Sequence, residues 1–242
     1  MPSVQALRIT FGTCIVAIRT PNEIILGADS LRRYGDGCAE VVCKIGREGN
    51  IVFAVAGFLG ALDDEAQKNL QVNIPEIVGE SIRLGFGIAD SLGNIKLAIE
   101  NGLAEYIRGC PNDDQSKVLA GLKDHGIEVV VCGMENDCPN LSAIELKLKS
   151  PFEIDFGVQI LDNIGVGDEG PVPYFAGFCA KYKAGGVDLS GERVQNVRRL
   201  IQMEIMLHEK REKKDRWVGP PIRIVRVDSS GIRWESGDEV CN

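Results

Sequence analysis

The sequence predicts a single α+β domain in which strands and helices are segregated along the chain. The expected order is strands, helices, strands, one helix and two closing strands, which favours separate layers over a doubly wound parallel sheet. Of the 242 residues, 44% are hydrophobic and 26% are charged, which is typical of a globular protein. No linker or internal repeat divides the chain, so we expect one domain.

The first part of the chain has the pattern of four short antiparallel strands. Each strand is an apolar, β-branched run, and turn-forming residues separate the runs within each pair. The four runs are residues 14–18, 24–28, 41–45 and 51–56. Gly57 ends this pattern, and a helix is expected over residues 59–70.

The rest of the chain alternates in blocks between helical and strand-like periodicity. Apolar residues at helical spacing run from 74 to 109, and a polar loop led by proline is expected over 111–115. Residues 191–214 carry an amphipathic stripe that predicts another helix. Further strands are predicted over 128–134, 143–148, 152–159, 222–227 and 231–235.

The charge balance and hydropathy exclude several classes of partner. The formal net charge of -8 argues against nucleic acid, because binding to phosphates requires a basic face. No apolar run approaches the roughly 20 residues of a membrane helix, so no membrane partner is expected. Arg8 is the only basic side chain near the start and no apolar core precedes it, so a secretory signal is not expected.

The eight cysteines are expected to be reduced. None forms a CxxC pair, and several lie in apolar runs where a thiol behaves as a small hydrophobe. With only His125 and His208 available, and no ligand spacing, a metal site is not expected. Reduced cysteines in a chain of this size predict a cytoplasmic protein.

The residues most suggestive of chemistry lie in the first four predicted strands. Lys44 interrupts an apolar run, and a lysine directed into a core needs a counter-charge. Asp29, at the end of the neighbouring strand, is the natural candidate. Thr13 follows Gly12 immediately before the first strand, and Gly57 closes the fourth.

This constellation resembles the proteasome β-subunit family, including its bacterial relatives. The interval from Thr13 to Asp29 matches the family's interval between threonine and aspartate, and Lys44 falls one residue short of the usual lysine. The resemblance implies a four-layer αββα sandwich of the N-terminal-nucleophile hydrolase type. It also implies that residues 1–12 are a propeptide or N-terminal extension and that 13–242 form the proteasome-like domain.

The resemblance assigns roles to five residues. Cleavage between Gly12 and Thr13 would expose the Thr13 α-amino group, which would act as base for its own hydroxyl. Lys44 and Asp29 would tune that amine, and the Gly57 N–H would bind the oxyanion. Asp215 matches an aspartate that follows the long C-terminal helix. The implied protein is a threonine endopeptidase without a cofactor, which acts on peptides or proteins in a ring of its own copies, with an ATPase as a potential partner.

Two departures from the family pattern keep alternatives open. Val166 and Val218 stand where active relatives have serines, and valine cannot make the hydrogen bonds of a hydroxyl. The alternatives are a catalytically inactive structural or regulatory subunit, an amidase acting on a small amide, and a non-enzymatic binding protein of another α+β fold. Two other nucleophiles are less favoured: Thr10, as an alternative N-terminal threonine, and Cys14.

Overall fold

The computed structural model describes residues 8–34, 38–62, 70–150, 155–184 and 186–235. The strands are β1 (Arg8–Gly12), β2 (Cys14–Arg19), β3 (Glu23–Asp29), β4 (Leu31–Tyr34), β5 (Ala39–Val41), β6 (Ile45–Glu48), β7 (Ile51–Leu62), β8 (Leu70–Asn73), β9 (Ile127–Glu135), β10 (Cys138–Leu148), β11 (Phe156–Leu161), β12 (Val172–Gly177), β13 (Ile222–Asp228) and β14 (Gly231–Trp234). The α-helices are α1 (Ile74–Arg83), α2 (Ile88–Gly109), α3 (Asn112–His125) and α4 (Arg193–Glu209), with short 3-10 segments η1 (Ala180–Ala184) and η2 (Lys213–Asp215).

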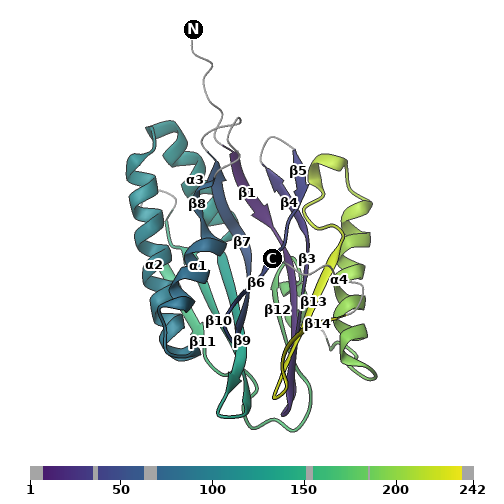
Figure 1. Ribbon diagram of the computed structural model, residues 1–242. Coiled ribbons are helices and arrows are strands. Elements are labelled where there is room, and N and C mark those ends of the chain that lie inside the picture. The colour runs from purple at the N-terminus through teal and green to yellow at the C-terminus, as the bar shows by residue number, and fades with distance from the viewer. Residues whose placement is uncertain (1–7, 35–37, 63–69, 151–154, 185, 236–242) are drawn as a thin grey trace.

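Within the described residues, the strands form two antiparallel sheets that face each other (Figure 1). The larger sheet has the order β11-β10-β9-β7-β1-β4-β5, with β6 and β8 also paired to β7. The smaller sheet has the order β12-β2-β3-β13-β14. The chain passes from β1 in the larger sheet to β2 in the smaller one through the single residue Thr13, which places this residue at a junction between the sheets.

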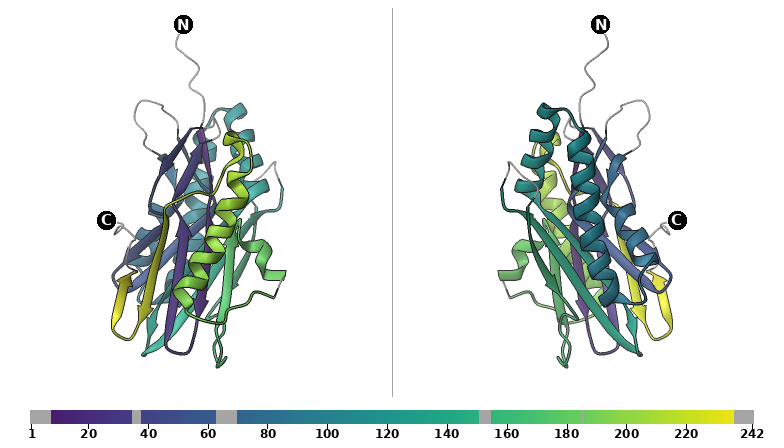
Figure 2. Two further views of the ribbon diagram at one scale, coloured as in Figure 1. Left: turned by 90° about the vertical axis from the view of Figure 1, so that its right-hand side faces the viewer. Right: turned by 90° about the vertical axis from the view of Figure 1, so that its left-hand side faces the viewer.

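The helices are distributed unequally over the outer faces. Helices α1, α2 and α3 lie against the larger sheet, whereas α4 runs along the smaller sheet (Figure 2). The Glu192 side chain caps α4 by accepting hydrogen bonds from the N–H groups of Val194 and Gln195. None of the helices in the described ranges is long and apolar enough to span a membrane.

Apolar side chains fill the spaces on both sides of each sheet. One cluster joins the larger sheet to α1–α3, a second lies between the two sheets, and a third joins the smaller sheet to α4. All six residues of β2 are therefore buried, because this strand has packing partners on both faces. The continuous apolar sequence of β2, without polar alternation, reflects this position.

The predicted fold class, α+β with a four-layer αββα sandwich, is wrong. The part of the chain that the structure describes is mostly β, with 41% strand against 33% helix, and contains two antiparallel sheets and four α-helices. The physical reason is that pairing between distant segments creates more strand than local patterns indicate. Strands β1, β4, β8 and β12 were not among the predicted elements, and each is held by partners elsewhere in the chain.

Several individual elements also differ from their predictions. The helix expected over 59–70 is wrong, since β7 continues to Leu62 and β8 begins at Leu70, while 63–69 lie outside the described residues. The loop expected over 111–115 is mostly the first turn of α3, which begins directly after Pro111. The strand expected over 41–45 is divided between β5 and β6, so Lys44 lies between strands.

Candidate active site

Thr13 occupies a strained position between the two sheets. Its φ is 118°, a value that β-branched residues rarely adopt, and Gly12 before it has a φ of 120°. The Thr13 side chain is fully buried, and its Oγ1 has no hydrogen-bond partner among the described residues. A buried hydroxyl without a partner is costly, and backbone strain of this kind is concentrated at functional sites.

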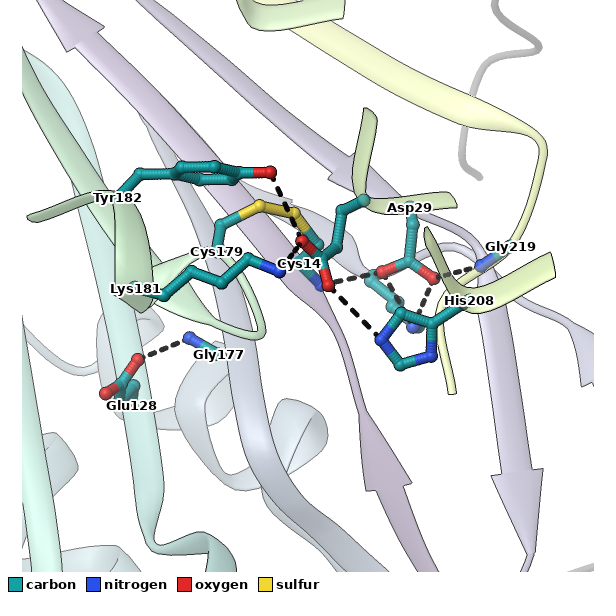
Figure 3. The surroundings of a disulfide bond; sticks show 11 residues. Cys14, Asp29, Glu128, Gly177, Cys179, Lys181, Tyr182, His208 and Gly219 are labelled. Carbon is teal, nitrogen blue, oxygen red and sulfur yellow. Dashed lines mark hydrogen bonds and ion pairs between the residues drawn. A yellow bond between two sulfur atoms is a disulfide. The ribbon is translucent and has the colours of Figure 1, made fainter. Parts of the chain in front are cut away.

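Asp29 is a buried acceptor for three backbone N–H groups around this junction. Its Oδ1 accepts from the N–H of Cys14 at 2.8 Å, and its Oδ2 accepts from the N–H groups of Leu31 and Gly219, each at 3.1 Å. Figure 3 shows the carboxylate between Cys14 and Gly219. Asp29 therefore fixes the backbone of the residue that directly follows Thr13.

Lys44 pairs with Asp29, the counter-charge that was predicted for it. Its Nζ lies 3.1 Å from Oδ1 and 3.0 Å from Oδ2 of Asp29, and the lysine side chain is only 2% exposed. Burial lowers the pKa of Lys44, while the Asp29 carboxylate acts in the opposite direction. The structure thus brings Asp29 and Lys44 together beside Cys14.

Gly57 lies directly opposite Gly12 in the pairing of β7 with β1. Its φ is 85°, and a Cβ at this position would lie 2.9 Å from the carbonyl oxygen of His125, so the site favours glycine. The neighbouring Phe58 N–H donates to the Gly126 carbonyl at 2.8 Å. The residue predicted to provide the oxyanion contact is therefore the strand partner of Gly12, which precedes Thr13.

A cavity of about 190 Å³ opens beside Thr13. Its lining includes Thr13, Gly57, His125, Glu128, Gly177 and Phe178. Glu128 accepts a hydrogen bond from the Gly177 N–H at 2.6 Å, and the Phe178 N–H donates to the Thr13 carbonyl at 3.0 Å. The end of β12 thus forms one wall of the cavity and holds the Thr13 backbone.

Two titratable groups of the cavity have shifted pKa values. Burial raises the pKa of Glu128, while the hydrogen bond from Gly177 acts in the opposite direction. Burial lowers the pKa of His125 and favours its neutral form, against the opposing charge of Asp124. Glu128 was absent from the sequence-based site, although a glutamate between Ile127 and the valines of β9 is a detectable signal.

A disulfide joins Cys14 to Cys179, across a separation of 165 residues. It connects the residue after Thr13 to the segment that follows β12, where Phe178 contacts the Thr13 carbonyl (Figure 3). Cys43 is disulfide-bonded as well. The prediction that the cysteines are reduced is therefore wrong for Cys14, Cys43 and Cys179, because the fold brings together thiols that are distant in sequence. It is confirmed for four others, which are reduced: Cys38, Cys110, Cys132 and Cys138.

The remaining predicted residues lie outside this cluster. Asp215 is exposed in η2, and within this segment it is Gly219 that contacts Asp29. Val218 is 2% exposed in the cluster beneath α4, and Val166 is 64% exposed. Asp215 is not among the residues that line the cavity beside Thr13.

A second buried polar group supports this segment from α4. His208 is fully buried, and its Nδ1 accepts from the Trp217 N–H at 3.1 Å. Its Nε2 lies 3.3 Å from Oε1 of Glu204, which also pairs with Lys181 at 2.6 Å. Burial would raise the pKa of Glu204, but the nearby His208 and Lys181 side chains lower it overall. We assign this group to positioning of the chain around Trp217.

In the described ranges, no group of three or more His, Cys, Asp or Glu side chains is arranged to hold a metal ion. The sequence matches no protein-family model and no curated protein.

Proposed function

We propose that this protein is a threonine N-terminal-nucleophile peptidase that processes itself between Gly12 and Thr13. The observation that carries the proposal is the environment of Thr13, whose hydroxyl is buried without a hydrogen-bond partner at a strained junction. The buried Asp29–Lys44 pair lies one residue away, through Cys14, and Gly57 faces Gly12. The family resemblance adds a ring of copies of this chain and a peptide or protein substrate.

The self-cleavage is an acyl shift from nitrogen to oxygen. The Thr13 Oγ adds to the Gly12 carbonyl carbon, a C–O ester bond forms and the C–N bond breaks. The hydroxyl proton is transferred to the departing nitrogen, which becomes the α-amino group of Thr13. Water then hydrolyses the ester and leaves Gly12 with a carboxylate. The strain at Gly12 and Thr13 favours this step because cleavage relieves it.

In later turnovers the free α-amino group would serve as the base. Its ordinary pKa of about 7.7–8.0 suits proton transfer at neutral pH. A cationic Lys44 near this amine would favour its unprotonated form, and Asp29 holds the lysine in place. The N–H of Gly57 would stabilise the oxyanion of each tetrahedral intermediate.

The test is the intact mass and N-terminal sequence of purified protein, compared between wild type and Thr13→Ala. We expect wild type to lose residues 1–12 and the variant to retain them. A threonine-directed electrophile should then add its mass at Thr13 of the processed chain. Labelling at Cys14, or an uncut wild type, would refute the assignment of the nucleophile.

A second candidate is a subunit of the same kind that does not cleave, with a structural or regulatory role. Three observations favour it: Asp215 is exposed, Val218 is embedded in apolar surroundings, and β1 is paired on both sides within the larger sheet. This candidate predicts that wild type and Thr13→Ala both retain residues 1–12 after assembly. The same measurement therefore decides between the two.

The cytoplasmic compartment, which was predicted from reduced cysteines, belongs to the proposal as well. The Cys14–Cys179 disulfide opposes it, because reducing compartments rarely retain structural disulfides. Fractionation of cells that express the protein, with thiols blocked at lysis, would determine both the compartment and the oxidation state.

A further inference from the structure

Strand β1 lies where a bound peptide would have to lie for Thr13 to act on it. It pairs antiparallel with β7 on one side and with β4 on the other (Figure 1). The strand ends at Gly12, and the next residue is Thr13. A segment held in this way by backbone pairing on both edges is a common mode of peptide recognition.

The side chain at position 11 fills an aromatic pocket. The Phe11 ring lies 4.2 Å from the His125 ring at an angle of 34°, and 6.0 Å from the rings of both Phe58 and Trp217 in edge-on contacts. These walls come from β7, the end of α3 and the segment after η2. Phe11 is 8% exposed, so the pocket encloses almost all of its ring.

The two neighbouring positions have their own requirements. A Cβ on Gly12 would approach the Trp217 carbonyl oxygen to 2.8 Å at a φ of 120°, which disfavours any larger residue there. The Thr10 hydroxyl is fully buried and donates to the Gly60 carbonyl at 3.1 Å. Counted from the cleaved bond toward the N-terminus, the groove therefore favours glycine, then an aromatic residue, then a residue with a hydroxyl group.

We propose that the groove occupied by β1 is the substrate site, and that it selects extended peptides with an aromatic residue directly before a glycine at the cleaved bond. The inference rests on the proposed function and names its substrate class. In the intact chain β1 is the first substrate and excludes others. The pocket of Phe58, His125 and Trp217 sets the preference, since aromatic rings contribute contact energy beyond the area that they bury.

The first test is the rate of self-cleavage of the full chain carrying Phe11→Leu or Phe11→Tyr. Phe156→Leu is the matched control, because Phe156 is equally buried at 8% in the same apolar cluster but lies on the edge strand β11. We expect Phe11→Leu to slow cleavage by at least about tenfold, Phe11→Tyr to retain most of it, and Phe156→Leu to change it by less than about twofold. Urea unfolding of each variant verifies that the two Leu variants are similarly destabilised.

The second test uses the processed protein after removal of the released residues 1–12, with two peptide amides that carry a fluorogenic leaving group, Arg-Ile-Thr-Phe-Gly and Arg-Ile-Thr-Ala-Gly. We expect kcat/KM to favour the Phe peptide by at least about tenfold. Equal rates for the two peptides, or equal self-cleavage of Phe11→Leu and wild type, would overturn the selectivity of the groove. An uncut wild type overturns the proposed function itself, so the two failures are distinguishable.

Discussion

Replacing Asp29 by asparagine should be among the most destabilising single changes in this protein. Asparagine keeps one oxygen that can accept from the Cys14 N–H, but its amide nitrogen replaces the acceptor that faces Leu31, Gly219 and Lys44. Lys44 would then be a buried cation without a counter-charge. Removing one partner of such a pair costs about 3–5 kcal/mol of unfolding free energy.

The reciprocal change, Lys44→Met, should cost less. The Asp29 carboxylate would still accept from three backbone N–H groups, which compensate part of its burial. We expect a loss of about 1–3 kcal/mol, because one hydrogen-bonded charged partner is removed. The double variant should lose less than the sum of the two single variants, with a coupling energy of up to about 3 kcal/mol.

Urea unfolding monitored by circular dichroism measures these differences. The surface pair of Arg83 and Glu48 has the same separation of 3.0 Å, so Arg83→Met is a matched control for a pair that water already screens. We expect its unfolding midpoint to stay close to that of wild type. If Asp29→Asn loses less than about 1 kcal/mol, or if the two changes add without coupling, the pair does not carry the energy that we assign to it.

The pH dependence gives an independent check on the same residue. Without Asp29 the pKa of Lys44 should fall further, since burial already lowers it and the carboxylate is what opposes this effect. Between the folded and unfolded pKa values the unfolded chain binds more protons, so stability rises with pH. The loss of unfolding free energy in Asp29→Asn, relative to wild type, should therefore become smaller as the pH is raised from 7 toward the ordinary lysine pKa of about 10.4. A deficit that is constant with pH would refute the explanation.

Three further predictions concern the neighbourhood of Thr13. Replacing Cys14 and Cys179 together by alanine should lower the unfolding free energy by about 2–4 kcal/mol, because their bond closes a long loop; an unchanged value in urea unfolding would refute the bond. Burial raises the pKa of Glu128, so the folded chain binds this proton more tightly than the unfolded chain does. The free energy of unfolding should therefore fall as the pH rises through the folded pKa. Glu128→Gln should flatten this part of a profile of unfolding free energy against pH, measured between pH 4 and 8. Gly12→Ala should lower the unfolding free energy by about 1–3 kcal/mol, because its Cβ would meet the Trp217 carbonyl oxygen at a positive φ; wild-type stability of this variant in urea unfolding would contradict the strain argument.

The parts of the fold that the sequence predicts well are those with a strong local pattern. Strands β2, β3, β9, β13 and β14 and helix α4 lie close to their predicted ranges, because β-branched and apolar residues or a helical stripe mark each of them locally. The continuation of β7 beyond Gly57 was not predicted, because a glycine after an apolar run usually indicates the end of a strand. In the structure this segment is held by β1 and β8, which is information that no local window contains.

The contacts of the candidate site also divide into those that a local sequence pattern predicts and those that depend on how distant strands pair. The pairing of Lys44 with Asp29 was predictable, because an isolated lysine in an apolar run requires a buried counter-charge. The contact between Cys14 and Cys179 was not, because it depends on how β12 pairs with β2. Glu128 reaches the cavity only because β9 and β12 face each other across the two sheets.

Strand β1 links the stability of the protein to its proposed activity. Its edges pair with β4 and β7, and Ile9 and Phe11 pack into the cluster beneath α1–α3. Cleavage at Gly12 would break one covalent bond but none of these contacts, so the released strand should remain bound as a product. Another peptide can enter only when this strand leaves, and its departure exposes two buried apolar side chains to water. The onset of turnover on other peptides is then set by the single release of β1 more than by the chemistry at Thr13, a limit of the kind that many enzymes meet at product release.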